Sequence, residues 1–306
     1  MARRLPGLTR ARCGRAASIA LASALLLAAL APATVLAKDR HIFWTVAGRH
    51  NTVYLLGSIH VLRAEDASLP PVATAAYDDA ERLVMEIDLD DDAGDPLAMA
   101  ATMQRMALLP DGRTLREVLG ADYAKITAHA QRSGLDLAAL DAFAPWFVTV
   151  TLLQLELASR GYSAEFGVEQ TISREAAADR KPIQGLETPQ QQFAILAGLP
   201  LPLQKRFLMM TLEDTEQLDA ELRDMLAAWK AGDTEKLARV LGDEFDEFPE
   251  LYRPLTEDRN RAWVPRLVDL LDDDDDYLVV VGALHLVGPN SIVDLLRQRG
   301  FTVTQQ

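Results

Sequence analysis

The chain is poor in three features that would indicate particular protein classes. One cysteine, Cys13, occurs among 306 residues, which excludes a fold held by disulfides. Aromatic residues make up 6% of the chain and leave few rings for stacking on nucleic-acid bases. Lys and Arg number 31 against 45 Asp and Glu, so the formal charge of −14 disfavours broad binding to a phosphate backbone. We therefore expect no nucleic-acid partner.

Two short catalytic motifs are absent as well. The chain has no HExxH sequence, and no Gly-x-Ser-x-Gly turn surrounds Ser58. The composition is that of a folded protein, with 49% hydrophobic and 25% charged residues and a mean hydropathy of +0.00. We expect a large globular fold whose chemistry lies in other motifs.

The first 37 residues differ in composition from the rest. Residues 1–15 contain five arginines and no acid, and an alanine-rich apolar stretch runs from Ala16 to Ala31. This order, followed by Val35-Leu36-Ala37, is typical of a secretory signal peptide. Cleavage after Ala37 would change the formal charge from −14 to −19 by removing the five arginines. We predict a bacterial protein of the periplasm or the exterior, with no stable membrane span after cleavage.

The remaining residues alternate between strand-like and helix-like patterns. β-Branched, aromatic and apolar runs predict strands at 41–46, 52–57, 83–88, 181–186, 277–281 and 301–304. Helical patterns occur between these strands and dominate the stretches at about 96–180 and 200–250. We expect a single α/β domain over 38–306, in which helices flank a central sheet and the middle of the chain forms a largely helical insertion.

One short motif follows two of the predicted strands. The motif is Gly-x-x-His, at Gly57-Ser58-Ile59-His60 and at Gly282-Ala283-Leu284-His285. Glycine at a strand end permits an unusual turn, which directs the histidine toward the carboxyl edge of the sheet, where α/β folds place their sites. The repetition favours a functional role for both histidines. We expect His41, His50 and His129, which lack this context, on the surface or in loops.

An acidic residue lies within one predicted buried strand. Glu86 belongs to Val84-Met85-Glu86-Ile87-Asp88, and a carboxylate in such a strand needs a positive partner. A buried arginine would satisfy it structurally, whereas a metal ion held by His60 and His285 would satisfy it as part of a site. The sequence leaves both alternatives open.

These segments together resemble the TraB/GumN family. The resemblance rests on the two Gly-x-x-His motifs and the Glu86 strand, on Lys181-Pro182-Ile183 with Leu186-Glu187-Thr188, and on Arg259-Asn260 followed by Trp263. It covers nearly all of residues 41–306. It implies a hydrolase fold related to the metal-dependent Tiki proteases and, more distantly, to erythromycin esterase-like and ChaN-like proteins.

The resemblance also implies a set of site residues. His60, His285 and Glu86 match two histidines and an acidic residue of the family, and are expected to hold a divalent metal such as Mn, Co, Fe or Zn. Glu86 is expected to act as third ligand or as general base on a metal-bound water. Arg259 is expected to stabilise an oxyanion, and Glu187 to orient a histidine or protonate the leaving group.

The sequence is compatible with three functions. The first is peptide hydrolysis by a metal-activated water between the two motifs. The second is hydrolysis of an ester or lactone without metal, in which His60 or His285 is the general base and Glu86 orients it. The third is a non-catalytic binding or accessory role in the periplasm. In each case the expected partner is a peptide or a small molecule.

Overall fold

A six-stranded mixed sheet forms the centre of the protein. The computed structural model describes residues 40–87, 96–213, 218–246 and 249–306, and Asp39–Gln306 form one compact unit. The predicted signal peptide lies outside the described residues and stays a prediction. The strands are β1 (Phe43–Ala47), β2 (Thr52–Ser58), β3 (Arg82–Ile87), β4 (Ile183–Glu187), β5 (Tyr277–Gly282) and β6 (Val303–Gln305).

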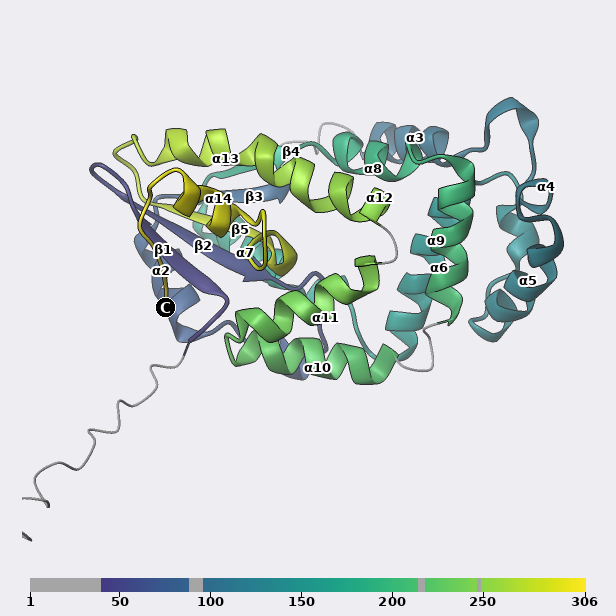
Figure 1. The fold of residues 1–306 in the computed structure, drawn as a ribbon, viewed down its shortest axis with the longest axis horizontal. Helices are drawn as coiled ribbons and strands as arrows, with labels where there is room; N and C mark the ends of the chain where they lie inside the picture. The colour runs from purple at the N-terminus through teal and green to yellow at the C-terminus, as the bar shows by residue number, and fades with distance from the viewer. Residues whose placement is uncertain (1–39, 88–95, 214–217, 247–248) are drawn as a thin grey trace, which may run out of the picture. The chain divides into compact units, whose positions relative to one another are not determined.

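The strand order brings four carboxyl ends together at one edge of the sheet. The order is β4-β3-β5-β2-β1-β6 (Figure 1). Strands β2, β3, β4 and β5 pair in parallel, whereas β1 is antiparallel to β2 and to β6. The register pairs Ser58 with Gly282 and Ile87 with Glu187. Both Gly-x-x-His motifs therefore begin at the edge where the Glu86 strand ends.

The main hydrophobic core surrounds this sheet. Every residue of β5 is buried, because β5 lies at the centre of the sheet between β2 and β3. Helices that bury apolar residues in the same core include α2 (Pro71–Asp79), α7 (Val168–Asp179), α13 (Asp258–Leu270) and α14 (Ile292–Gln298). The expected α/β fold with a central sheet flanked by helices is confirmed.

The middle of the chain is helical, as expected, and has a core of its own. The helices that enclose it are α3 (Pro96–Ala107), α4 (Leu115–Leu119), α5 (Tyr123–Arg132), α6 (Pro145–Ser159), α8 (Pro189–Ala197) and α9 (Leu201–Glu213). Helix α6 is the most apolar, and it begins at Pro145, since proline fits a first helical turn. Within the described part of the chain, no helix has the length and apolar character needed to cross a membrane.

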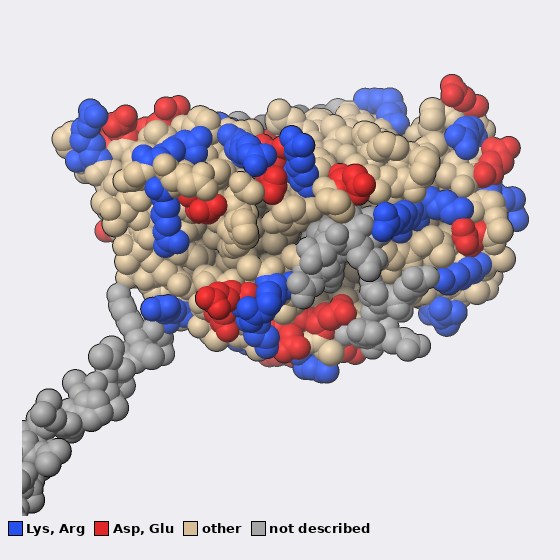
Figure 2. Space-filling view, in the orientation of Figure 1, with Lys and Arg blue, Asp and Glu red and all other residues tan. Residues whose placement is uncertain are grey.

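Two further helices lie beside the strand edge that carries the first motif. They are α10 (Leu218–Lys230) and α11 (Thr234–Asp246). Trp229 of α10 donates its indole N–H to the carbonyl of Gly57 at 2.7 Å. Acidic and basic side chains are interspersed on these helices in Figure 2, and Lys236 pairs with Asp224 at 2.8 Å. One side of the helix pair is thus anchored to the sheet, while the other presents mixed charge.

The expectation that His129 lies on the surface or in a loop is wrong. His129 belongs to α5 and is 5% exposed, whereas His50 is exposed. It lies three residues after the buried Ile126, on the face of α5 that packs inward. Its Nδ1 is 3.2 Å from Arg132, and its Nε2 is 3.5 Å from a carboxylate oxygen of Glu156. A polar residue on a buried helix face gave no local signal of its burial.

The burial of His129 makes the fold sensitive to mild acid. Burial lowers the pKa of His129, with Glu156 opposing the shift and Arg132 adding to it. The unfolded chain therefore binds a proton at this histidine more readily than the folded chain does. The free energy of unfolding is highest, as far as His129 is concerned, above about pH 6.5 and decreases as the pH falls below that value. We expect His129→Gln to weaken the decrease in unfolding free energy between pH 7.5 and pH 5 in urea titrations. Equal slopes for variant and wild type would contradict this assignment.

Gly57 has no room for a side chain. A Cβ at this position would lie 2.3 Å from Cγ2 of Ile42 and 3.2 Å from Cα of Ala283. We expect Gly57→Ala to destabilise the protein by about 1–3 kcal/mol through overpacking. A Cβ added at Gly242 in α11 would meet no atom of the rest of the protein within 4 Å. Gly242→Ala is therefore the control, and it should stabilise the protein by about 0.5–1 kcal/mol because alanine loses less backbone entropy than glycine in a helix. Urea unfolding of the two variants should therefore shift in opposite directions.

Candidate active site

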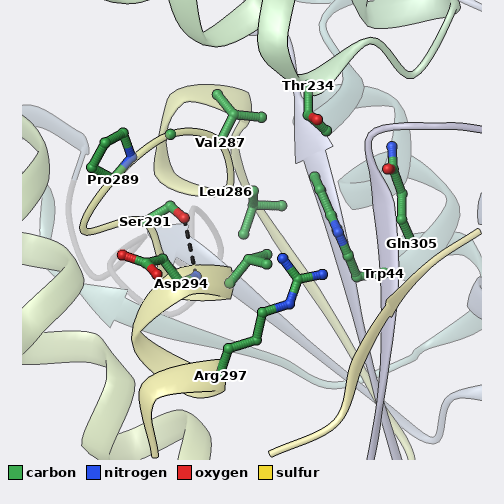
Figure 3. Close-up of a pocket in the computed structure, with 11 residues that line it drawn as sticks. Trp44, Thr234, Leu286, Val287, Pro289, Ser291, Asp294, Arg297 and Gln305 are labelled. Atoms are coloured by element: carbon green, nitrogen blue, oxygen red, sulfur yellow. Dashed lines mark hydrogen bonds between the residues drawn. The ribbon is translucent and has the colours of Figure 1, made fainter.

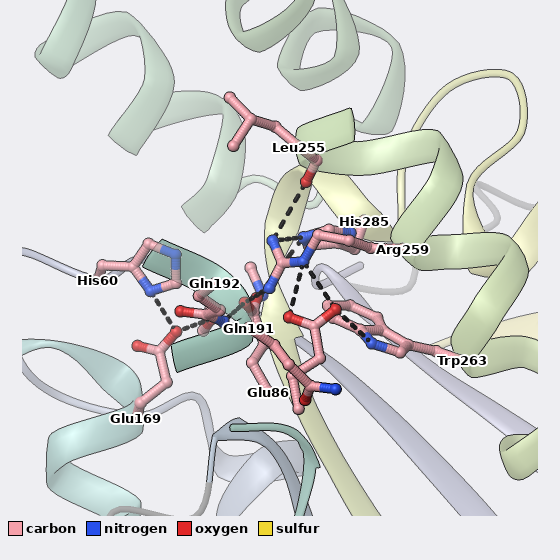
Figure 4. A network of polar contacts seen from close by, with 12 residues as sticks. His60, Glu86, Glu169, Gln191, Gln192, Leu255, Arg259, Trp263 and His285 are labelled. Carbon is pink, nitrogen blue, oxygen red and sulfur yellow. Dashed lines mark hydrogen bonds and ion pairs between the residues drawn. The ribbon is translucent and has the colours of Figure 1, made fainter. Parts of the chain in front are cut away.

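A cavity of about 350 Å³ opens where the parallel strands end. Side chains from β3, α7, α8, α13 and the segment after β2 contribute to its wall. They include His60, Glu86, Glu169, Gln192 and Arg259. The sheet topology thus brings residues from distant parts of the sequence to one site (Figure 4).

Glu86 is the most enclosed acid of this site, with a side chain that is 9% exposed. Its Oε1 accepts the backbone N–H of Gly282 at 2.7 Å. Its Oε2 accepts from Nη2 of Arg259 at 2.6 Å and from Nε2 of Gln192 at 3.0 Å. Three donors from three elements therefore hold the carboxylate in one orientation.

The charges around Glu86 fix its ionisation. Burial by itself raises the pKa of Glu86, but His285 in its protonated form, the charges of His60 and Arg259 and the N–H of Gly282 outweigh it and lower the pKa to about 2. Burial lowers the pKa of His285 to about 4, with Arg259 adding to the decrease and Glu86 opposing it. At neutral pH Glu86 is a carboxylate, His285 is neutral, and Arg259 is the permanent cation beside both.

His285 is held at both ring nitrogens. Its Nδ1 lies 2.6 Å from Oδ1 of Asn260, whose Nδ2 donates to the carbonyl of Asn290 and so fixes the orientation of the amide. Since that oxygen only accepts, the proton of the neutral ring is on Nδ1. Nε2 is left with a lone pair, 3.1 Å from Nη1 of Arg259 and 3.7 Å from Oε1 of Glu86.

His60 and Glu86 both lie close to Gly282. A Cβ on Gly282 would lie 3.3 Å from Nε2 of His60 and 3.1 Å from Oε1 of Glu86, so the glycine leaves the space between them open. Nδ1 of His60 is 2.6 Å from Oε1 of Glu169, and Ser58 donates to the same oxygen. The charge of Glu169 is the main cause that raises the pKa of His60 to about 9.

Arg259 joins the two acids of the site. It follows a π-helical turn (Arg253–Glu257), and its Nη1 donates to the carbonyl of Leu255 within that turn at 3.1 Å. Its Nε donates to both carboxylate oxygens of Glu187, at 3.0 and 3.2 Å. Trp263 also donates to Glu187, at 3.0 Å. Among the described residues, the hydrogen bonds of Glu187 thus run to Arg259 and Trp263, and its predicted role toward a histidine stays a prediction.

Two residues of this site, Glu169 and Gln192, are not predicted by any sequence pattern. Glu169 is the second residue of α7, where an acid is common because it complements the helix dipole. Gln192 is the last of three consecutive glutamines at the start of α8, where Gln191 forms a capping box with Thr188. The local sequence thus explains both residues as ordinary features of a helix start. Only their contacts across the sheet edge show that they belong to the site.

The imidazole and carboxylate groups of this site are ligand types that bind divalent transition metals. Each histidine has its Nδ1 held by an oxygen, as is typical of metal-binding imidazoles, and Nε2 of His285 lies 3.7 Å from Oε1 of Glu86. With its pKa raised to about 9, His60 would have to release the proton on Nε2 before that atom could bind an ion. Within the described ranges no three His, Cys, Asp or Glu side chains form a group that could hold a metal ion. Arg259 contacts both His285 and Glu86 instead. The guanidinium therefore supplies a positive charge at the place where an ion would share these ligands.

A second cavity, of about 410 Å³, lies beside α14 and β6 (Figure 3). Its polar side chains form hydrogen bonds with the backbone that are structural. Ser291 accepts the N–H of Asp294, Arg297 donates to the carbonyl of Val303, and Gln305 donates to the carbonyls of His41 and Gly232. Of the two motif histidines, His60 lines the first cavity, and His285 contacts Glu86 and Arg259, which line it.

Comparison with known proteins finds relatives over most of the chain. The chain is 26% identical over 268 residues to the uncharacterised protein YbaP of Escherichia coli (strain K12), covering 85% of this chain and 95% of that protein. It is 25% identical to metalloprotease TIKI2 of Xenopus tropicalis and 24% to metalloprotease TIKI1 of Homo sapiens, each over 318 residues. Both alignments cover 85% of this chain, but 58% and 61% of the metalloproteases.

A family model matches most of the chain. No solved structure matches it. The TraB/PrgY/gumN model matches residues 42–305, which include all six strands of the sheet and both Gly-x-x-His motifs. The chain belongs to the TraB/PrgY/gumN family.

Proposed function

We propose that this protein is an exported hydrolase that cleaves peptide bonds with a divalent metal at the Glu86 site. The observation that carries the proposal is that the buried carboxylate of Glu86 and both motif histidines lie around Gly282 and Arg259, with both histidine Nδ1 atoms held by oxygens. The distant relatives named metalloproteases support the reaction class. Export rests on the predicted signal peptide.

In this proposal His60, His285 and Glu86 would hold the ion, which requires them to move from the arrangement of the described structure. A bound Mn, Co, Fe or Zn ion would supply a Lewis acid and a water of lowered pKa. The protein prepares its ligands by hydrogen bonding. Gly282 and Gln192 orient the carboxylate, while Asn260 keeps the proton of His285 off the nitrogen that faces Glu86.

Arg259 has two tasks in the proposed hydrolase. It keeps Glu86 ionised, because a guanidinium at 2.6 Å favours the carboxylate form. It also lines the cavity beside Glu86, with Nη1 on the lone pair of His285 Nε2. Release of that contact would free an N–H for a developing oxyanion, the role expected for Arg259.

A metal-independent hydrolase is the second candidate. The Arg259–Glu86 ion pair favours it, because the buried carboxylate already has a cation without any metal. His60 is then the group that exchanges protons with substrate, since it lines the cavity and its side chain is 66% exposed. Glu86 and Arg259 would act on the carbonyl of an ester or lactone.

The metal content of the purified protein tests the first proposal. We expect one Mn, Co, Fe or Zn ion per chain by mass spectrometry, and loss of that ion in His60→Ala and in His285→Ala. His50→Ala should retain it, because His50 is an exposed residue outside the site. A peptide library should then be cleaved only by the proteins that carry the ion. Absence of metal from the wild type after reconstitution would favour the second candidate, and absence of hydrolysis as well would favour a binding role.

The Arg259–Glu86 pair gives an independent test by stability. Arg259→Met leaves two buried carboxylates without their cation, and we expect a loss of roughly 3–5 kcal/mol. Glu86→Gln should lose less, because Arg259 keeps its ion pair with Glu187. The double variant should lose less than the sum, since both members of the pair are gone. Added Mn²⁺ should stabilise Arg259→Met more than wild type, because the ion replaces the missing positive charge, but should not stabilise Glu86→Gln. Urea unfolding with and without Mn²⁺ measures all three effects, and no gain for Arg259→Met would contradict the proposed ligands.

A further inference from the structure

The two motif histidines are anchored by different chemistry. His285 is buried, and its Nδ1 is held by the neutral amide of Asn260. The His60 side chain is 66% exposed, and its Nδ1 is held by the carboxylate of Glu169. An exposed imidazole has no packing to fix its ring. Its orientation must come from a hydrogen bond.

The backbone around Glu169 is built against the first motif. The N–H of Val168 donates to the carbonyl of Ile59 at 3.1 Å. A Cβ on Gly167 would lie 2.3 Å from the carbonyl oxygen of His60, so only glycine permits this close approach. The first turn of α7 is therefore fixed directly to the residues that carry the His60 ring.

The carboxylate of Glu169 is itself held in place. Its Oε1 accepts from Ser58, the second residue of the same Gly-x-x-His motif, and from Nδ1 of His60. Glu169 also lines the cavity, and its side chain is 19% exposed. Ser58 is 2% exposed, so one end of this short network lies in the core and the other reaches the site.

We propose that Glu169 is a positioning residue that keeps a proton on Nδ1 of His60 and thereby presents Nε2 to Glu86. The use of that Nε2 as a metal ligand rests on the proposed function, whereas the positioning itself rests on the contacts of Ser58, His60 and Glu169. A carboxylate that accepts from Nδ1 fixes both the tautomer and the rotation of the ring. Loss of such a partner weakens metal binding by about 10–100-fold in known sites.

A purely structural ion pair would behave differently. A pair that includes a largely exposed histidine contributes little to the stability of a fold. Loss of Glu169 should therefore change the site far more than the urea midpoint. A role in packing alone would change the midpoint and leave the ring of His60 as it is.

Two variants at one position and a matched control separate these roles. Glu169→Met removes the acceptor in a side chain of similar length, and Glu169→Gln keeps an acceptor oxygen. Glu165→Met is the control, since Glu165 is exposed four residues earlier and the charge change is the same. In calorimetric titrations of the full chain with Mn²⁺, we expect Glu169→Met to bind 10–100-fold more weakly, Glu169→Gln to recover part of the loss, and Glu165→Met to bind like wild type.

A second readout needs no metal. In ¹⁵N-labelled metal-free protein, we expect a His60 Nδ1–H proton that exchanges slowly with solvent, identified by its absence from His60→Gln. The signal should persist in Glu165→Met and disappear in Glu169→Met. If wild type binds no Mn²⁺ but shows this pattern, the positioning role stands and the metal proposal fails. If the signal and the Mn²⁺ affinity of Glu169→Met equal those of wild type, the positioning role is overturned.

Discussion

The buried carboxylate of Glu86 is the constraint on which the rest of the site depends. A charge inside an otherwise apolar strand loses its hydration and must be compensated by charge and hydrogen bonds. The compensation comes from Arg259 on α13, Gly282 at the end of β5 and Gln192 on α8. One acid thus links the sheet, the C-terminal helices and the helical middle of the chain at a single place.

The two Gly-x-x-His motifs become chemically different through what they contact. One histidine is enclosed, neutral at physiological pH and joined to an amide, and the other is exposed at the cavity and joined to a carboxylate. Four residues of sequence are too few to encode that difference. It arises because the motif after β5 lies beneath α13, whereas the motif after β2 meets the first turn of α7.

Family membership and site geometry contribute different parts of the functional argument. The TraB/PrgY/gumN match identifies the family, and the relatives named metalloproteases, at about 25% identity, support the reaction class that we propose. The geometry adds that Arg259 lies between Glu86 and His285, so a metal and the guanidinium would act on the same two groups. The balance between these two cations decides whether the hydrolysis we propose is metal-dependent.

The sequence by itself determined the strands, the helical middle, the place of Glu86 within a strand and the place of the two motifs at strand ends. Those features follow from local patterns, since hydrophobic periodicity and glycine at a strand end act over a few residues. Only the tertiary structure decided that Arg259 is the partner of Glu86, that Glu169 holds His60, and that His129 is buried. Each of these depends on packing between elements far apart in the chain, where a polar residue carries no local mark of the neighbour that will satisfy it.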